Sequence, residues 1–109
     1  MTKVGSWLAD NLPPDSLVIV STDFSHYLTK ADADSHDSVT RELILNSDVS
    51  KILRLNNDNV DSPASLATAL LYAEKTSLNT EIIRQGNSFD FLEQKPVETT
   101  SYFGIIFTK

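Results

Sequence analysis

Two residues of this sequence are spaced for acid-base or metal chemistry: Asp23 and His26 lie three positions apart. A turn that brings them together would let the carboxylate fix the tautomer of the imidazole and favour its protonated form. A histidine held in this way serves as a general acid or base, or as a metal ligand. We therefore predict catalytic roles for Asp23 and His26, with His26 also a candidate metal ligand. The structural alternative is that Asp23 caps the following turn and His26 is a partly exposed loop residue.

Asp61 is a second candidate metal ligand, because its carboxylate could join His26 if both residues face one pocket. It precedes Ser62 and Pro63, a typical helix start, so a helix-capping role explains it as well. His36 lies in a run of charged residues, and a solvated helix face accounts for it. The sequence contains no Gly-rich phosphate loop, no nucleophile elbow and no closely spaced histidine pair. The hydroxyl residues near the histidine do not by themselves predict a hydrolase.

The polar cluster at residues 21–27 directly follows a continuous apolar run at residues 17–20. A run of this length, preceded by a proline pair, is typical of a strand buried on both faces, as in a parallel sheet. Loops at the carboxyl ends of such strands converge on a crevice where ligands bind. We therefore expect Asp23 and His26 to lie at that crevice.

The rest of the chain alternates helical and strand patterns. Apolar residues at helical spacing predict four helices, at about residues 3–11, 34–45, 48–55 and 63–75. The inner face of the second helix is expected to carry Val39, Leu43 and Ile44. β-Branched and aromatic residues predict two further strands, at residues 80–85 and 101–108, with an irregular loop at 89–99 between them.

These elements predict a single α/β domain over residues 1–109. We expect a layered structure with a small central, largely parallel or mixed sheet flanked by helices. The first helix leads straight into the expected central strand, as in a segment cut from the middle of a larger α/β protein.

The amino-acid composition excludes some classes of binding partner and some kinds of metal ligand. The chain of 109 residues has 15 acidic and 9 basic residues and a net charge of −6. This balance argues against nucleic acid, because binding to a phosphate backbone depends on lysine and arginine. No apolar run approaches the roughly 20 residues that cross a bilayer, so we expect no membrane partner.

The sequence has no cysteine, so a metal would need His, Asp or Glu ligands. The absence of cysteine also leads us to expect a cytoplasmic location.

The segment at residues 17–27, an apolar strand followed by Asp-Phe-Ser-His-Tyr, resembles the signature strand and loop of the Memo family. These proteins are relatives of the class III extradiol ring-cleavage dioxygenases. The resemblance continues through residues 61–73 and 87–90 and ends in the strand at 102–107. It covers nearly all of this chain and the C-terminal part of a typical Memo protein.

The resemblance implies part of the Memo and extradiol dioxygenase fold, with a metal-type pocket in which Asp23 and His26 match pocket residues. Family members have been linked to copper or iron redox chemistry and, separately, to phosphotyrosine peptides. Two features depart from the family: its two metal-facing histidines belong to an N-terminal half that this sequence does not contain, and Asp61 replaces a pocket cysteine. Because carboxylate is a harder ligand than thiolate, a retained site would favour a divalent non-haem metal such as iron.

The resulting functional hypothesis is a Memo-like domain with an Asp/His pocket resembling a non-haem metal-dependent dioxygenase or redox site. The pocket is expected to need an N-terminal half, or a second copy of the chain, that completes the sheet. Its ligand would be a small molecule or a peptide. The alternative is a non-catalytic module that binds a protein or peptide as a scaffold.

Overall fold

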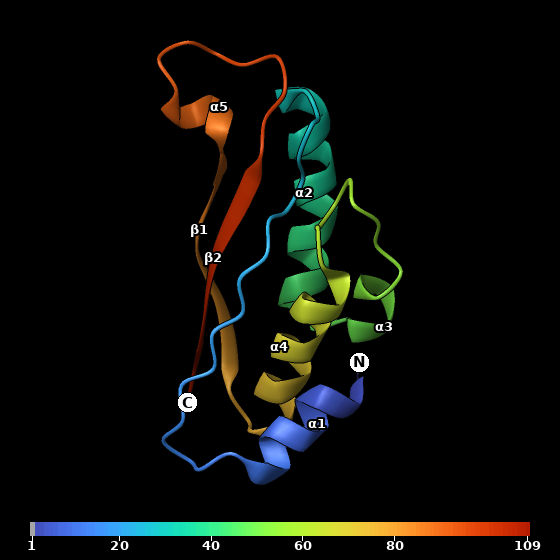
Figure 1. Ribbon diagram of the computed structural model, residues 1–109, viewed down its shortest axis with the longest axis vertical. Coiled ribbons are helices and arrows are strands. Elements are labelled where there is room, and N and C mark those ends of the chain that lie inside the picture. Colours follow the sequence, from blue (N-terminus) through green and yellow to red (C-terminus); the bar gives the residue numbers. More distant parts are fainter. Residues whose placement is uncertain (1) are drawn as a thin grey trace.

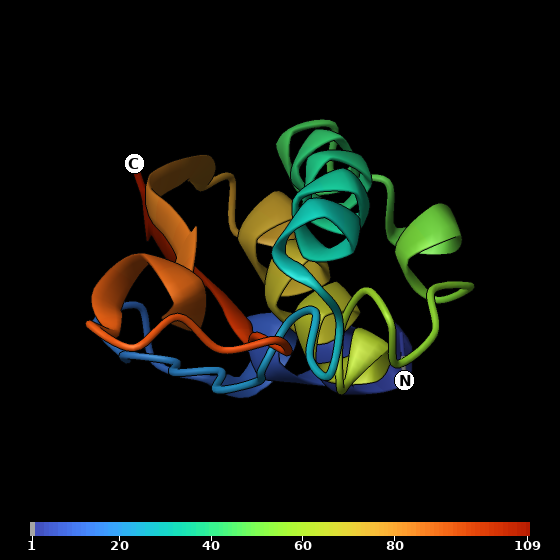
Figure 2. The same cartoon turned by 90° about the horizontal axis from the view of Figure 1, so that it is seen from above.

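The computed structural model describes residues 2–109 and consists of five helices and one two-stranded sheet (Figure 1). In chain order the elements are α1 (Thr2–Asn11), α2 (Lys30–Leu45), α3 (Val49–Ile52), α4 (Pro63–Lys75), β1 (Asn79–Asn87), α5 (Ser88–Phe91) and β2 (Ser101–Thr108). Figure 2 shows the β1–β2 ribbon on one side of the molecule and α2, α3 and α4 on the other. The predicted α/β class is therefore confirmed.

The expectation of a largely parallel or mixed sheet is wrong, because β1 and β2 pair in antiparallel fashion. The two strands follow each other in sequence and are joined by residues 88–100, a connection that returns the chain along the strand it has just left. Parallel neighbours need a crossover that carries the chain back to the starting end, and no such crossover joins two strands here. β1 also extends through Gly86 and Asn87, two residues beyond the predicted end of this strand.

The predicted strand at residues 17–20 does not form. These residues run extended beside the ribbon but have no strand partner, and Leu17 and Ile19 are 83% and 78% exposed. A buried strand needs a neighbour on each edge and a covered face on each side. Within residues 2–109 nothing supplies these, so the most apolar stretch of the sequence lies largely at the surface.

Helix α2 buries the predicted face only in part: Ile44 is fully buried and Leu43 packs against the core. Its buried residues are Ala33, Asp37, Thr40 and Ile44, whereas Val39 is 52% exposed. The buried positions recur every three to four residues, which is the spacing of one helix face. An aspartate and a threonine lie on this face, so apolar periodicity alone could not identify it.

Helix α4 begins where the sequence predicted, with Pro63 in its first turn. The cap is Ser62 and not Asp61: the Ser62 hydroxyl accepts a hydrogen bond from the amide of Ser65 at 3.3 Å. The helix ends at Lys75, also as predicted. Since the cap is supplied by Ser62, the Asp61 carboxylate is free of the capping role that the sequence allowed for it.

Replacing Ser62 by alanine is expected to lower the free energy of unfolding by about 1 kcal/mol, because the first turn of α4 loses its side-chain acceptor. Asp61→Ala is the matched control and should change the stability by less than about 0.5 kcal/mol, since Asp61 is exposed. Denaturant titration followed by circular dichroism measures both. A larger loss in Asp61→Ala than in Ser62→Ala would identify the aspartate as the cap.

The hydrophobic core lies between α4, α2, α3 and the inner face of the ribbon. Its buried members are Phe24, Ile44, Ile52, Val60, Leu66, Ala67 and Leu70. Helix α1 packs closely on α4 at Gly5, where an added Cβ would lie 3.1 Å from the carbonyl oxygen of Thr68 and would force a small shift of the two helices. Among residues 2–109, no helix combines the length and apolar character that crossing a membrane requires.

Candidate functional site

The segment that carries His26 is tied to the start of β2 by main-chain hydrogen bonds. The amide of Phe24 donates to the carbonyl of Ser101 at 3.2 Å, and the amide of Ser101 donates to the carbonyl of Ser25 at 2.6 Å. A third bond joins the amide of Thr99 to the carbonyl of Leu28 at 2.8 Å. His26 is therefore held by hydrogen bonds on both sides of it, although the segment forms no regular strand.

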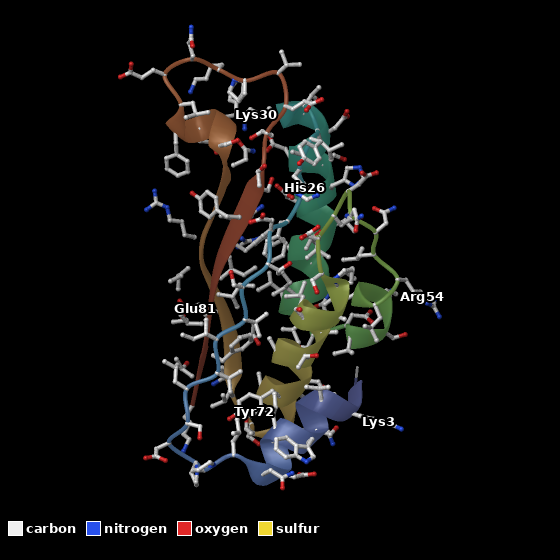
Figure 3. All side chains as sticks on the ribbon, in the orientation of Figure 1. Lys3, His26, Lys30, Arg54, Tyr72 and Glu81 are labelled. Atoms are coloured by element: carbon white, nitrogen blue, oxygen red, sulfur yellow. The ribbon has the colours of Figure 1, made fainter. Side chains whose placement is uncertain are left out.

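A second set of contacts brings Asp61 beside His26. The amide of Asp61 donates to the carbonyl of Asp23 at 2.8 Å, and the amide of Ser62 donates to the hydroxyl of Thr22 at 3.1 Å. As a result, the Nε2 atom of His26 lies 3.8 Å from Oδ1 of Asp61. The side chains are 19% and 55% exposed, so the pair lies at a rim that solvent reaches. Figure 3 shows His26 near the upper end of α2.

The structure does not bring the Asp23 carboxylate to His26. Asp23 is exposed, and in the described part of the chain its side chain makes no hydrogen bond or ion pair. Its contribution is made by the main chain, through the carbonyl that positions Asp61. The acid beside the imidazole is thus Asp61, which the sequence suggested as a metal ligand together with His26.

Tyr27 adopts a left-handed backbone conformation, with φ of 60°. For a residue other than glycine this conformation costs roughly 1–2 kcal/mol, so it persists only where the surrounding contacts fix it. Its ring lies 4.8 Å from the imidazole of His26, centre to centre, and is 76% exposed. The pair of rings forms an exposed aromatic edge beside the His26–Asp61 pair.

A buried polar group that sequence reasoning missed lies directly behind this segment. Asp37 on α2 is 2% exposed, and its Oδ1 accepts a hydrogen bond from the Ser25 hydroxyl at 2.7 Å. Burial raises the pKa of the Asp37 carboxyl, while Ser101 and Ser25 act in the opposite direction. The Ser101 hydroxyl is buried without a hydrogen bond of normal geometry. This cluster anchors the residue before His26 to α2.

A charged cluster closes the same end of the molecule. The ammonium of Lys30 lies 3.0 Å from Oδ2 of Asp34 and 3.5 Å from Oδ1 of Asp90. The hydrogen bond to Asp34 raises the pKa of Lys30. Asn87 donates to the other oxygen of Asp34 at 3.1 Å. Because these contacts join α2 to the end of β1 and to α5, they hold these three elements in place beside the site.

The metal-binding capacity of the site is limited to two ligands. Among residues 2–109 there is no group of three or more His, Asp, Glu or Cys side chains placed to hold one metal ion. The His26–Asp61 pair supplies two such side chains. Two ligand atoms that each lie about 2.1 Å from one tetrahedral ion are about 3.4 Å apart. The His26–Asp61 pair, at 3.8 Å, would therefore have to close slightly to share an ion. An ion held here would need further ligands from water or from another molecule.

A groove with many apolar lining residues lies beside the segment that leads to the site. With a volume of about 960 Å³, it lies between residues 12–22, α4 and β2. Its lining includes Val18, Leu66, Phe103, Ile105 and Phe107. The groove therefore brings the segment that leads to His26 next to an uncovered part of the core.

Comparison with known proteins identifies no relative: the chain matches no family model, no curated protein and no solved structure. The resemblance of residues 17–27 to the Memo signature stays a prediction from the sequence.

Proposed function

We propose that this domain forms one wall of a Memo-like metal pocket, in which His26 and Asp61 are the residues that face the ion. Another polypeptide would supply the remaining ligands. The observation that carries the proposal is the 3.8 Å approach of Nε2 of His26 to Oδ1 of Asp61. Asp23 serves this site as a positioning residue through its carbonyl group.

The electrostatics of the pair favour a divalent cation. An imidazole nitrogen and a carboxylate oxygen are the ligands of non-haem iron and manganese sites, and they disfavour Cu(I), which prefers sulfur. The net charge of −6 attracts cations to the surface. Metal bound here would act as a Lewis acid or redox centre, whereas His26 and Asp61 would hold it and Tyr27 would flank the open side.

The proposal predicts weak binding of Mn²⁺ by the isolated chain, with affinity lowered about tenfold or more in His26→Ala and in Asp61→Asn. The physical reason is that each substitution removes one of two protein ligands. Isothermal titration calorimetry with Mn²⁺ measures the affinity, and electron paramagnetic resonance reports the number of ions bound.

The chain offers a matched control in its other histidine. His36→Ala removes an imidazole of α2 that is not part of the His26–Asp61 pair, and it should leave Mn²⁺ affinity within about twofold of the wild type. Equal affinity in the wild type, His26→Ala and His36→Ala would refute a metal site at this pair.

The groove supports a second candidate, a module that binds a protein or peptide without catalysis. Its apolar lining, which includes Phe103 and Ile105, resembles the surfaces that bury an extended peptide. The two functions differ in their dependence on His26: peptide binding in the groove should survive His26→Ala, whereas metal binding should not.

A further inference from the structure

The outer edge of β2 presents unpaired main-chain groups to the groove. Ser101 directs both its amide and its carbonyl toward Phe24 and Ser25, away from β1. In an antiparallel pair, alternate residues direct these groups to opposite edges. The one register irregularity of the ribbon falls on β1, between Ile82 and Arg84, so the alternation along β2 is unbroken. The residues of β2 whose main-chain amides and carbonyls point away from β1 are therefore Phe103, Ile105 and Phe107.

The opposite wall of the groove is residues 16–22, which we term the strap. In the described part of the chain, no main-chain hydrogen bond joins the strap to β2. A second hollow of about 340 Å³ lies between the strap, α1 and α4, and Ile19, Val20 and Ser21 line both spaces. The strap thus lies between two hollows, and the amide of Phe24, which follows it, is bonded to Ser101. Figure 1 shows this segment running alongside β2.

We propose that the strap closes onto the free edge of β2 as a third antiparallel strand. The register follows from the bond that already exists between the amide of Phe24 and the carbonyl of Ser101. Continued outward two residues at a time, it places the following pairs opposite each other: Thr22 and Phe103, Val20 and Ile105, and Val18 and Phe107. Each pair directs its amides and carbonyls toward its partner.

The exposure of the strap side chains supports this register. Phe103, Ile105 and Phe107 pack on the core side of the ribbon. Residues directly opposite each other share a face, so Val18 and Val20 would turn inward with them. These two are already less exposed than Leu17 and Ile19, which would turn outward beside Ile106. A slip of one residue would reverse the two faces and bury the wrong pair.

Closure would also cover the exposed edge of the two-stranded ribbon. A two-stranded ribbon has little independent stability, and an uncovered strand edge is a site of non-native pairing. The strap is tethered at Phe24, so closing it costs less entropy than recruiting a separate chain. Closure would further order Thr22 and Asp23, whose oxygens accept from the amides of Ser62 and Asp61. The proposal does not depend on metal binding by His26.

Disulfide trapping tests the register in a chain that has no native cysteine. Ile19 and Ile106 would face each other as a non-hydrogen-bonded pair, with Cα atoms about 4.5 Å apart, within disulfide reach. Ile19→Cys/Ile106→Cys should therefore form its disulfide in a glutathione buffer at least about tenfold faster than two control pairs. Mass spectrometry measures the rates.

The controls displace the strap cysteine while keeping the β2 cysteine. Leu17→Cys/Ile106→Cys places the thiols on one face but diagonally, with about 7–8 Å between their Cα atoms. Val20→Cys/Ile106→Cys places them on opposite faces. Equal rates in all three variants, or no disulfide in the Ile19 variant, would overturn the proposed register.

Hydrogen exchange of the unmodified chain provides an independent measurement. Closure predicts that the amides of Phe103, Ile105 and Phe107 are protected to a degree comparable with those of Tyr102, Gly104 and Ile106, which point toward β1. Protection that alternates along β2, with fast exchange at the three outward amides, would show that the edge stays open and the strap unpaired.

Discussion

Replacing Leu70 by alanine is expected to lower the free energy of unfolding by about 2–5 kcal/mol. Leu70 is fully buried at the middle of α4 and belongs to the one cluster that joins that helix to Phe24, Ile44 and Ile52. Truncation removes apolar surface from the core and leaves a cavity that the surrounding helices fill only in part. Domains of this size are stable by about 5–15 kcal/mol, so the loss is a large share of the total.

Leu92→Ala is the matched control for this experiment. Leu92 follows α5 and is 49% exposed, so the same chemical change should cost about 0.5 kcal/mol or less. Urea titration followed by circular dichroism gives both values. Losses of equal size in the two variants would contradict the placement of the core around Leu70.

The sequence predicted those helices whose apolar periodicity and end signals agree. The helix at 63–75 has Ser62 and Pro63 at its start and a strong apolar face, and the structure has α4 at Pro63–Lys75. The strand at 101–108 is likewise β2, since its aromatic and β-branched residues match a half-buried ribbon. Residues 89–91 were predicted as loop, but the amide of Asn87 donates to Oδ2 of Asp90 at 3.1 Å, and this bond closes the first turn of α5.

The prediction of a buried strand at residues 17–20 was wrong because a local sequence pattern does not determine burial. Four apolar residues specify a preference for burial, yet burial depends on neighbours that the run does not encode. In the structure Leu17 and Ile19 are exposed because nothing within residues 2–109 covers the face on which they lie. The predicted sheet direction failed for the same reason, since it assumed that this strand was central.

The sequence identified three candidate residues, but not which of the two carboxylates lies beside the imidazole. Asp23, His26 and Asp61 were all identified from residue type and position. Which acid approaches the imidazole depends on the main-chain bond from Asp61 to Asp23, and this bond spans a long stretch of chain. The burial of Asp37 was not predicted, because this residue lies in a run of charged residues and such residues are usually exposed to solvent.

The buried Asp37 carboxyl predicts a pH dependence of stability that Asp37→Asn should abolish. Burial raises the pKa of Asp37 in the folded protein above its ordinary value of 3.8, with Ser101 and Ser25 opposing the rise, Asp34 adding to it and His36 reducing it. A raised folded-state pKa means that the folded protein binds the proton more tightly than the unfolded chain. The associated stabilisation is complete below pH 3.8 and is lost as the pH rises through the folded-state pKa.

Asparagine at this position carries no charge at any pH and can still accept the hydrogen bond from Ser25. The stability of Asp37→Asn relative to the wild type should therefore increase from pH 3 upward and level off above the folded-state pKa of the wild-type carboxyl. Unfolding free energies measured by urea titration across this range give the difference curve.

Two further variants separate the charge of Asp37 from its hydrogen bond. Asp37→Leu leaves the buried Ser25 hydroxyl without its acceptor and should cost about 1–3 kcal/mol at every pH. Asp58→Asn removes an exposed carboxylate from the loop before α4 and should leave the pH dependence of the wild type unchanged. A flat difference curve for Asp37→Asn, parallel to that of Asp58→Asn, would mean that folding leaves the proton affinity of Asp37 unchanged and that its burial carries no electrostatic cost.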